Sequence, residues 1–368
     1  MSDVMSLESM KEVRIVGVGE LEYAEVPLPQ LAADEVLVEV ALTGVCGSDI
    51  PRYLQGQVHN FPQVLGHEFS GTVVAVGEDA DAGLISKRVA GIPLVPCMTC
   101  ASCQEGGFAL CKSYSFIGSR RQGSMAQYVA VPQSNVLEVG EEVSMLQAAF
   151  FEPATVALHG ARLLGMSRNS CPQGSVAIIG AGTIGILLAQ ALVAYGVETV
   201  VLFDTAKERL ETARAAGLGH LISVNDVDKE KKVHDIVGSA GFARVFDVAG
   251  VSESIAYSFE LAGPHGQICL IGNPRSPVTM TAQQWEEINR KELTVIGSWM
   301  SYSAPWPGAE WHDAVELFAD GSLRIVDEMV DAIYPLANAK EAFERFRDPS
   351  SVGGKILIDS RVSKEQTS

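Results

Sequence analysis

Four cysteines near the end of the first third of the chain have types and spacing that could bind a metal. Cys97, Cys100, Cys103 and Cys111 fall within fifteen residues, separated by two, two and seven residues. Four thiolates on one short loop can close a tetrahedral zinc site without an open position, and such a site stabilises structure without doing chemistry. We therefore predict a structural zinc lobe over residues 92–115.

Two other interpretations of this cysteine cluster stay open. Intramolecular disulfides would require an oxidising compartment, which the absence of a secretory pattern disfavours. A zinc-ribbon module that binds nucleic acid is opposed by the flanks, because Lys112, Arg120 and Arg121 are too few to follow a phosphate backbone.

A second set of possible metal ligands is spread more widely. Cys46 lies in Gly-Val-Cys-Gly-Ser-Asp, His67 and Glu68 lie in Gly-His-Glu-Phe-Ser-Gly, and Glu152 lies in Phe-Glu-Pro. A thiolate, an imidazole and a carboxylate are the donors of a catalytic zinc site that keeps one position open for water or substrate. Taken singly, each residue has an ordinary explanation, since a lone histidine is more often packed and a lone glutamate more often solvated. Their occurrence together indicates a catalytic zinc.

Such a site would suit the oxidation of an alcohol. A bound Zn²⁺ lowers the pKa of a hydroxyl by several units and so favours the alkoxide from which a hydride can leave. Ser48 lies beside Cys46 and could pass the hydroxyl proton towards solvent. The hydride would be accepted by a nicotinamide, and the sequence contains a motif for binding that cofactor.

The cofactor motif is Gly-x-Gly-x-x-Gly at Gly180, Gly182 and Gly185. It follows the apolar run Val176–Ile179 and opens an apolar helical stretch, which is the context that makes the motif credible. The first glycine permits a tight turn, the second lets the backbone approach a pyrophosphate, and the third allows close packing of helix and sheet. The N–H groups at the start of the helix, around Thr183 and Ile184, would bind the phosphates.

Asp204 ends the next predicted strand, nineteen residues after Gly185. A carboxylate there accepts hydrogen bonds from both adenosine ribose hydroxyls and repels a 2′-phosphate, so NAD is favoured over NADP. Arg209 is a further expected cofactor contact. A glycine-punctuated turn with an unrelated role remains the alternative.

The chain has two parts with different secondary-structure patterns, and these parts must position the candidate sites. Residues 12 to about 150 look β-rich, with alternating strands at Val36–Leu42 and Gly71–Val76, and Met145–Gly165 reads as helical. After that, strands and helices alternate, which indicates a doubly wound parallel sheet in an α/β chain. The predicted strands of that sheet are Val176–Ile179, Thr199–Phe203, Leu221–Val224, Arg244–Val248, Gln267–Ile271 and Leu293–Ile296.

The closing segment contains one more predicted strand, Lys355–Asp359, which we expect to return to the first domain. The predicted domains are therefore 1–160 for the β-rich catalytic part, 161–297 for the nucleotide-binding part, and 298–368 for the return to the catalytic part.

Composition excludes several classes of partner. The 368 residues carry a formal net charge of −18, which disfavours nucleic acid and anionic membranes. The start of the chain lacks a basic patch followed by an apolar run, and the apolar region Val176–Phe203 is broken by glycines and polar residues. We expect a cytoplasmic enzyme whose seven cysteines serve metals before disulfides.

At this point the chain resembles the zinc-containing medium-chain dehydrogenases over essentially its whole length, and most of all their polyol branch. The motifs that carry the narrower match are Cys46–Arg52, Phe116–Arg121, and Arg290–Trp299 running into Pro305–Gly308. The resemblance implies a GroES-like catalytic domain, a Rossmann domain that binds NAD, and a homodimer or homotetramer.

The resemblance also implies roles for the candidate residues. Cys46, His67 and Glu152 would be catalytic-zinc ligands, and Glu68 would be a fourth, exchangeable ligand or a group just behind the ligands. The clustered cysteines would hold the structural zinc. Many relatives carry a histidine five residues after the ligand cysteine, where it ends the proton relay, but here that position is Pro51. His59 or water could take its place.

Several arginines suggest a phosphorylated polyol as substrate. Arg52 lies six residues after Cys46, and Arg120 and Arg121 follow the cysteine lobe on a segment that lines the cleft in the resembling family. A guanidinium fork suits a phosphate monoester, although each arginine could equally be a surface or domain-bridging cation. Trp299 could cover part of the cleft or simply pack.

The alternatives are the same chemistry on a free polyol of the sorbitol type, on arabitol phosphate or on threonine. A non-catalytic, NAD-binding or redox-sensing protein is a more distant alternative, because it would be expected to have lost a ligand.

Overall fold

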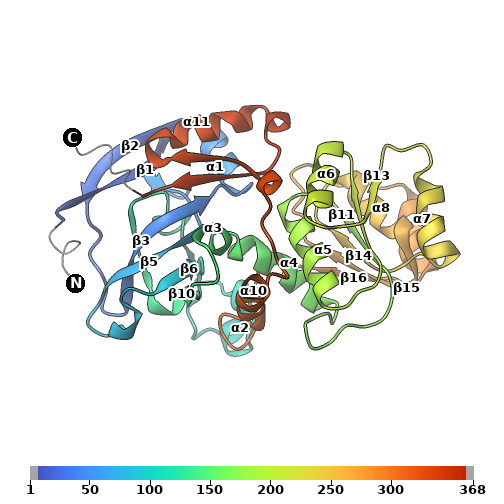
Figure 1. Cartoon of the computed structure of the whole chain (residues 1–368), viewed down its shortest axis with the longest axis horizontal. Coiled ribbons are helices and arrows are strands. Elements are labelled where there is room, and N and C mark those ends of the chain that lie inside the picture. The colour runs from blue at the N-terminus through green and yellow to red at the C-terminus, as the bar shows by residue number, and fades with distance from the viewer. Residues whose placement is uncertain (1–6, 362–368) are drawn as a thin grey trace. The chain divides into compact units, whose positions relative to one another are not determined.

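The computed structural model describes residues 7–361 and divides into two compact units (Figure 1). The first unit comprises the chain up to Glu152 together with Ser303–Pro307 and the segment from Val330 onward. The second comprises Pro153–Tyr302 and Gly308–Met329. These limits differ from the expected 160 and 297, because the helix after Glu152 and the segment 308–329 pack with the nucleotide-binding fold.

The first unit is built from β-strands, as expected. A three-stranded sheet has the order β2 (Glu20–Pro27), β1 (Ser9–Gly17), β4 (Gln63–Val64). A seven-stranded sheet has the order β10 (Val136–Glu138), β6 (Arg88–Gly91), β5 (Glu68–Val76), β3 (Glu35–Gly44), β18 (Lys355–Asp359), β17 (Val330–Pro335), with β9 (Tyr128–Pro132) also paired to β3. The strand predicted at 355–359 thus joins the first unit, beside β3.

Short elements complete this unit. They are α1 (Asp49–Gln55), α2 (Ala101–Gln104), α3 (Met145–Ala148) and α11 (Ala339–Glu344), together with the small β7 (Leu94–Val95) and β8 (Ser115–Phe116) pair.

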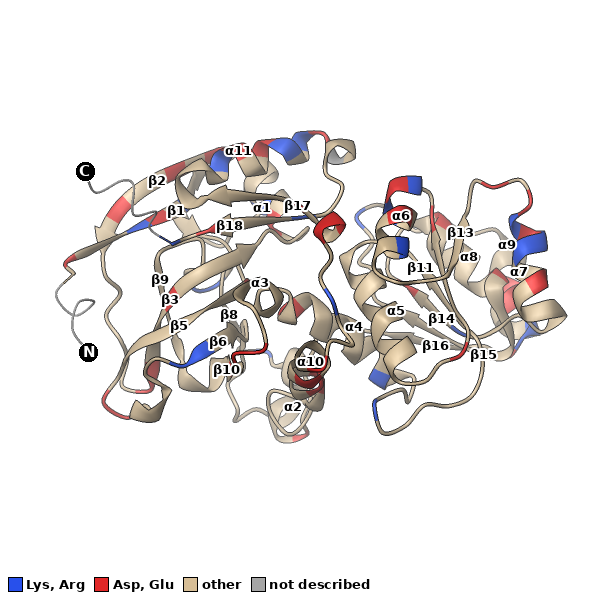
Figure 2. Ribbon diagram, in the orientation of Figure 1, with Lys and Arg blue, Asp and Glu red and all other residues tan. Residues whose placement is uncertain are grey.

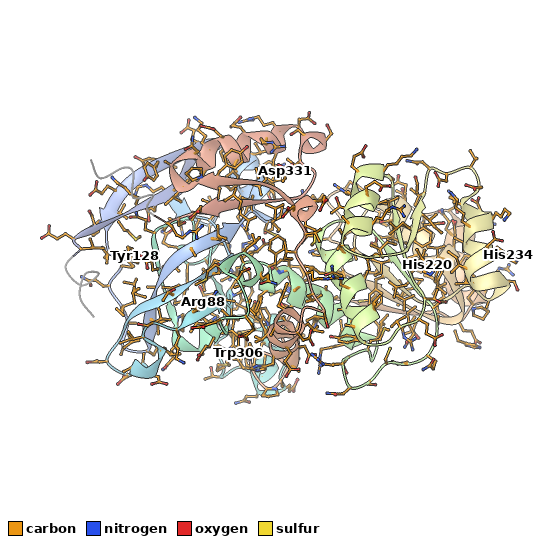
Figure 3. All side chains as sticks on the ribbon, in the orientation of Figure 1. Arg88, Tyr128, His220, His234, Trp306 and Asp331 are labelled. Atoms are coloured by element: carbon orange, nitrogen blue, oxygen red, sulfur yellow. The ribbon has the colours of Figure 1, made fainter. Side chains whose placement is uncertain are left out.

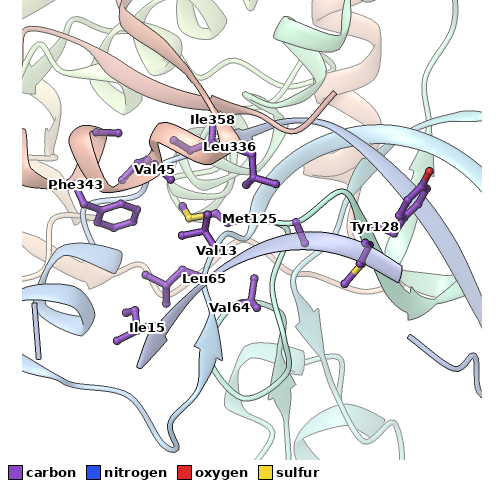
Figure 4. Packing of buried hydrophobic residues seen from close by; sticks show 14 of the residues in the cluster. Val13, Ile15, Val45, Val64, Leu65, Met125, Tyr128, Leu336, Phe343 and Ile358 are labelled. Carbon is purple, nitrogen blue, oxygen red and sulfur yellow. The ribbon is translucent and has the colours of Figure 1, made fainter. Parts of the chain in front are cut away.

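A buried hydrophobic cluster anchors the segments that carry the candidate ligands (Figure 4). Val45 directly precedes Cys46, Leu65 lies two residues before His67, and Ile356 begins the apolar stretch of the last strand. All three side chains are buried. Burying an aliphatic side chain of this size stabilises the folded state by about 1.5–3 kcal/mol, so the polar residues next to them are held on a rigid base.

The second unit is a parallel sheet, and the predicted doubly wound topology is confirmed. Its order is β13 (His220–Ser223), β12 (Val200–Asp204), β11 (Val176–Ile179), β14 (Phe242–Asp247), β15 (Ala262–Leu270), β16 (Thr294–Gly297). The helices are α5 (Thr183–Ala194), α6 (Lys207–Ala215), α7 (Lys229–Val237), α8 (Ser252–Leu261), α9 (Ala282–Arg290) and α10 (Ala309–Ala319). Strand order reverses between β11 and β14, where such sheets form a crevice for a ligand.

The helix predicted over 145–165 is two helices. It forms α3 and, after a break, α4 (Phe151–Leu163). Pro153 explains the break, because a proline ring clashes with the carbonyl four residues earlier, here that of Ala149, and is tolerated only in the first turn of a helix. The break places Glu152 at the start of α4 rather than in mid-helix.

Charges of both signs alternate along the outer helices α7 and α11 (Figure 2), and ion pairs such as Lys231–Asp235 join them. Within residues 7–361, none of the helices combines the length and apolar character needed to cross a membrane.

Candidate active site

Three predicted ligands come together in the first unit. The ligand atoms of Cys46, His67 and Glu68 all lie within 4.8 Å of one another. Cys46 follows the end of β3, Glu68 begins β5, and the two strands are in register at Gly44 opposite Glu68. A Cβ at Gly44 would lie 2.3 Å from Glu68 Oε2, so only glycine leaves room there for the carboxylate.

Asp49, which the sequence analysis did not single out, holds two of these ligands. Its carboxylate is fully buried; Oδ2 accepts the backbone N–H of Cys46 at 3.1 Å, and Oδ1 lies 3.6 Å from Nδ1 of His67. Among the described residues, His67 Nδ1 is buried without a hydrogen-bond partner. Because Nδ1 faces the carboxylate, Nε2 is the nitrogen available to a metal.

The charges of His67 and Glu68 act on the carboxyl group of Glu152, although Glu152 is not one of the three grouped ligands. Burial raises the pKa of its carboxyl to about 7, while His67 opposes this shift and the negative charge of Glu68 adds to it. The ligand role that the resemblance implies for Glu152 therefore remains a proposal, and the observed group contains Glu68 in its place.

Lys355 is a second residue that the sequence analysis missed. Its ammonium lies 2.6 Å and 2.9 Å from the two carboxylate oxygens of Glu68 and 3.4 Å from the carbonyl of Val45. Burial disfavours the charge, but the Glu68 carboxylate offsets this and the pKa of Lys355 is raised. The sequence feature that could have drawn attention to Lys355 is its position as the first residue of a strand predicted to return to the catalytic domain.

The chemistry of these residues fits a zinc ion. Burial, and then the charge of Glu68, raises the pKa of the Cys46 thiol well above its ordinary value, so a thiolate there requires added positive charge. Thiolate, imidazole and carboxylate are the donors that zinc accepts in open sites. A divalent cation held by Cys46, His67 and one of the two glutamates would also offset the buried negative charge.

The expected substrate residues have different surroundings within their own units. Arg52 lies against Ser48 and Asp49, with Nη1 at 3.1 Å and 3.0 Å from their side-chain oxygens. Arg120 stacks on Tyr114 at 4.2 Å from the ring centroid. His59 is exposed on the loop after α1. Trp299, in the second unit, is 48 % exposed.

Arg121, another expected substrate residue, lies beside a separate cavity. Its guanidinium forms an ion pair with Glu35, at the opposite end of β3 from Gly44. Both residues line a cavity of about 390 Å³ that also includes Glu12 and Tyr128; Tyr128 is labelled in Figure 3. The lining of that cavity contains none of the candidate metal ligands. The substrate role expected of Arg121 therefore stays a prediction.

The four clustered cysteines converge as predicted. Their sulfurs lie within 4.8 Å of one another and all four thiols are free. Cys100 Sγ and Cys103 Sγ are 3.5 Å apart, far beyond the roughly 2.05 Å of a disulfide bond. The N–H of Thr99 lowers the pKa of Cys97 to about 6, whereas burial raises that of Cys103 to about 12. This tetrad suits a closed zinc site.

Trp306 packs on this cysteine lobe. Its ring meets Phe108 edge-on at a centroid distance of 5.2 Å, and its Nε1–H donates to the carbonyl of Ser134 at 2.9 Å (Figure 3). Phe108 lies in the short turn Phe108–Leu110 just before Cys111. The position of the tryptophan therefore depends on the folded state of the lobe.

We predict that stripping metal from the lobe shifts the tryptophan emission of the protein to longer wavelength, because a loosened lobe exposes Trp306 to water. Emission spectra recorded before and after treatment with a strong chelator measure this shift. Trp306→Phe should lose most of the shift, whereas Trp285→Phe, which removes an exposed tryptophan, should retain it. An equal shift in both variants would contradict the dependence of Trp306 on the folded state of the cysteine lobe.

The glycine motif forms the expected turn in the second unit. Gly180 has φ 112°, and α5 begins at Thr183 directly after Gly182. A Cβ at Gly185 would lie 1.8 Å from the carbonyl oxygen of Gly180, which explains the third glycine. The free N–H groups at the start of α5 lie at the carboxyl edge of the sheet, where they can bind phosphate.

Comparisons with known proteins agree with this geometry. Residues 32–141 match the alcohol dehydrogenase GroES-like domain, and residues 183–320 match the zinc-binding dehydrogenase domain. Galactitol 1-phosphate 5-dehydrogenase of Escherichia coli K12 is 36 % identical over 92 % of this chain and 97 % of its own. The chain belongs to the zinc-dependent medium-chain alcohol dehydrogenases. It is thus an oxidoreductase acting on CH–OH groups.

Other members of this dehydrogenase family are similar across nearly the whole chain. D-arabitol-phosphate dehydrogenase of Enterococcus avium is 30 % identical over 94 % of this chain and 95 % of its own. Sorbitol dehydrogenase of Bacillus subtilis 168 is 28 % identical over 92 % of this chain and 94 % of its own.

Solved structures show the same fold. The crystal structure of the E. coli galactitol-1-phosphate dehydrogenase superposes with a TM-score of 0.88, covering 95 % of this chain and all of that one. An alcohol dehydrogenase from E. coli CFT073, solved with NADH, is 26 % identical, covers 96 % and 99 % of the two chains and gives a TM-score of 0.84. This chain is therefore an NAD(P)-dependent dehydrogenase with a GroES-like and a Rossmann-type domain.

Proposed function

We propose that this dehydrogenase oxidises a secondary hydroxyl of a polyol phosphate with NAD⁺, giving the keto sugar phosphate, NADH and a proton. Galactitol 1-phosphate is the first candidate substrate. The observation that carries the chemistry is the grouping of Cys46, His67 and Glu68 where β3 ends and β5 begins. The phosphate is supported by two relatives whose names give polyol phosphates as their substrates.

In the proposed site, Cys46, His67 and either Glu152 or Glu68 would hold one catalytic zinc, and the cysteine tetrad would hold one structural zinc. When bound at the first site, zinc supplies a Lewis acid that lowers the pKa of the substrate hydroxyl. Asp49 keeps the imidazole of His67 and the backbone of Cys46 in place. Ser48, which is exposed beside Cys46, accepts the hydroxyl proton and passes it to water.

NAD rather than NADP is the proposed cofactor. Asp204 ends β12, and its two oxygens accept the backbone N–H groups of Ala181 and Ala206, each at 2.8 Å. These bonds fix a carboxylate beside the glycine turn, where it would bind ribose hydroxyls and repel a 2′-phosphate. Arg209 lies 3.8 Å from that carboxylate and partly balances its charge.

Asp204→Ala should weaken NAD binding about tenfold, since hydrogen bonds to a charged group are worth about 1.5–3 kcal/mol, and should narrow the preference for NAD over NADP. Dissociation constants for both cofactors, measured by fluorescence titration, give the result. Asp235→Ala removes an exposed carboxylate paired with Lys231 and should change neither constant. An unaltered NAD-to-NADP ratio in Asp204→Ala would remove this residue from cofactor selection.

The assay for the proposed function follows NADH formation by its absorbance with zinc-replete protein. It compares galactitol 1-phosphate and arabitol phosphate with free galactitol, sorbitol and arabitol. A phosphorylated polyol should exceed the free polyols by orders of magnitude in kcat/KM. Equal rates would retain the enzyme class and remove the phosphate specificity.

A second candidate is the same chemistry on a free polyol, which the similarity to sorbitol dehydrogenase favours. Threonine belongs in the same panel. A protein that binds NAD without turnover is the remaining alternative, and metal analysis that finds only the cysteine tetrad occupied would support it.

We also propose that the chain forms homodimers or homotetramers. β16 is the end strand of its sheet, and Val295 on it and Trp285 nearby on α9 are 38 % and 57 % exposed. An exposed apolar strand edge favours pairing with another chain. Light scattering should give a multiple of the 39.2 kDa chain mass, and a monomer would contradict the proposal.

A further inference from the structure

Arg52 is bonded within the proposed metal site through one nitrogen. It lies in α1, three residues after Asp49 and four after Ser48, so the three side chains share one face of the helix. Nη1 alone makes both contacts, at 3.1 Å to Ser48 Oγ and 3.0 Å to Asp49 Oδ1. The arginine side chain is only 18 % exposed.

The contact between Arg52 and Asp49 places a positive charge beside a buried carboxylate. This carboxylate is wholly buried, accepts the backbone N–H of Cys46 and lies 3.6 Å from Nδ1 of His67. A buried carboxylate is stable as an anion only beside positive charge or strong donors. Arg52 supplies such a charge, and it lies on the same oxygen that faces His67.

The contact between Arg52 and Ser48 restricts the orientation of the serine hydroxyl. A hydroxyl has one hydrogen to donate and two lone pairs to accept with. Because Arg52 donates to the Ser48 oxygen, it fixes the direction of one lone pair and therefore limits where the hydroxyl hydrogen can point. Pro51 offers no proton-carrying side chain next to Ser48, so in α1 the polar group on this hydroxyl is the guanidinium of Arg52.

We infer that Arg52 is a positioning residue for the dehydrogenase reaction: one nitrogen of its guanidinium holds Ser48 and Asp49 in place beside Cys46 and His67. The inference rests on the proposed alcohol oxidation and not on the phosphate. Its consequence is that Arg52 governs turnover of phosphorylated and free polyols alike. A residue that served only to bind phosphate would instead govern KM for phosphorylated substrates.

The use of a single nitrogen provides a sharp test. A lysine ammonium can donate to two oxygens from one nitrogen, but it cannot reproduce the two-nitrogen fork that grips a phosphate. Arg52→Ala should therefore lower kcat about 100-fold, the range typical of a misplaced proton-transfer group, on galactitol 1-phosphate and on the best free polyol. Arg52→Lys should recover kcat to within about tenfold of the natural enzyme.

A second readout does not need turnover. In protein reconstituted with Co²⁺, the visible absorption bands report the geometry of the cysteine and histidine ligands. Arg52→Ala should shift these bands and Arg52→Lys should largely restore them. Arg14→Ala is the matched control, because this arginine is also partly exposed and ion-paired, with Glu22 at 2.8 Å, and is expected to leave bands and rates unchanged.

The outcomes separate the inference from the proposed function. An unchanged cobalt spectrum together with a loss confined to KM for phosphorylated substrates, not rescued by lysine, would overturn the positioning role. If the natural enzyme oxidises no polyol at all, the proposed function fails, and the cobalt spectra still decide the role of Arg52.

Discussion

Replacing Cys46 with serine should lower kcat for alcohol oxidation by at least about 1,000-fold, while the dissociation constant for NADH stays within about twofold. A metal Lewis acid contributes several kcal/mol to such a reaction, and each 1.36 kcal/mol corresponds to a factor of ten in rate. Serine is a far weaker zinc ligand than a thiolate. The glycine turn and Asp204 belong to the other compact unit, so cofactor binding should persist.

Steady-state kinetics, fluorescence titration with NADH and metal analysis together test this prediction. The zinc content should fall by one ion per chain. Cys171→Ser is the matched control, because Cys171 lies outside both groups of candidate ligands and its replacement should alter neither turnover nor zinc content. Loss of NADH affinity in Cys46→Ser would show that the metal and cofactor sites do not act separately.

Replacing Lys355 with methionine should lower the free energy of unfolding of the metal-free protein by about 3–5 kcal/mol, the typical cost of removing one partner of a buried ion pair. The side chains of Lys355 and Glu68 are only 11 % and 2 % exposed, and their charged atoms lie 2.6 Å apart. Without the ammonium, the Glu68 carboxylate would be buried without its main counter-charge. Zinc should reduce the loss, because it offers Glu68 a second positive partner.

Urea unfolding with and without zinc measures this effect. Lys87→Met is the control, since it breaks an exposed pair with Glu138 of the same 2.6 Å length and should cost no more than about 1 kcal/mol. The double variant Lys355→Met with Glu68→Leu should recover much of the loss, because apolar replacements of buried pairs are often neutral. Equal losses in Lys355→Met and Lys87→Met would refute the prediction.

Much of this fold could be predicted from hydrophobic periodicity alone. The strand Lys355–Asp359 has the predicted bounds, and Val176–Ile179 likewise opens the nucleotide-binding sheet where expected. Such strands are short apolar runs between turn residues, so their signal is local. The break between α3 and α4 could also have been predicted, because its cause is local. In a continuous helix the ring of Pro153 would clash with the carbonyl of Ala149, four residues earlier.

The missing parts of the site depend on contacts between distant residues. Glu68 and Lys355 are separated by 287 positions, and no spacing rule connects them. The sequence analysis assigned no role to Asp49, and only the structure shows it buried against His67. The ion pair of Arg121 with Glu35 likewise joins residues 86 positions apart and cannot be read from its neighbours in the chain.

The return of β18 to the side of β3 also has a consequence for how the enzyme matures. Glu68 lies in the first part of the chain and Lys355 near its end, so a ribosome must synthesise almost the whole protein before their ion pair can form. Most of the nucleotide-binding unit, Pro153–Tyr302, emerges earlier and can fold while the catalytic unit still lacks two strands. During synthesis Cys46, His67 and Glu68 are therefore made long before Lys355, and the buried Glu68–Lys355 ion pair forms late in biogenesis.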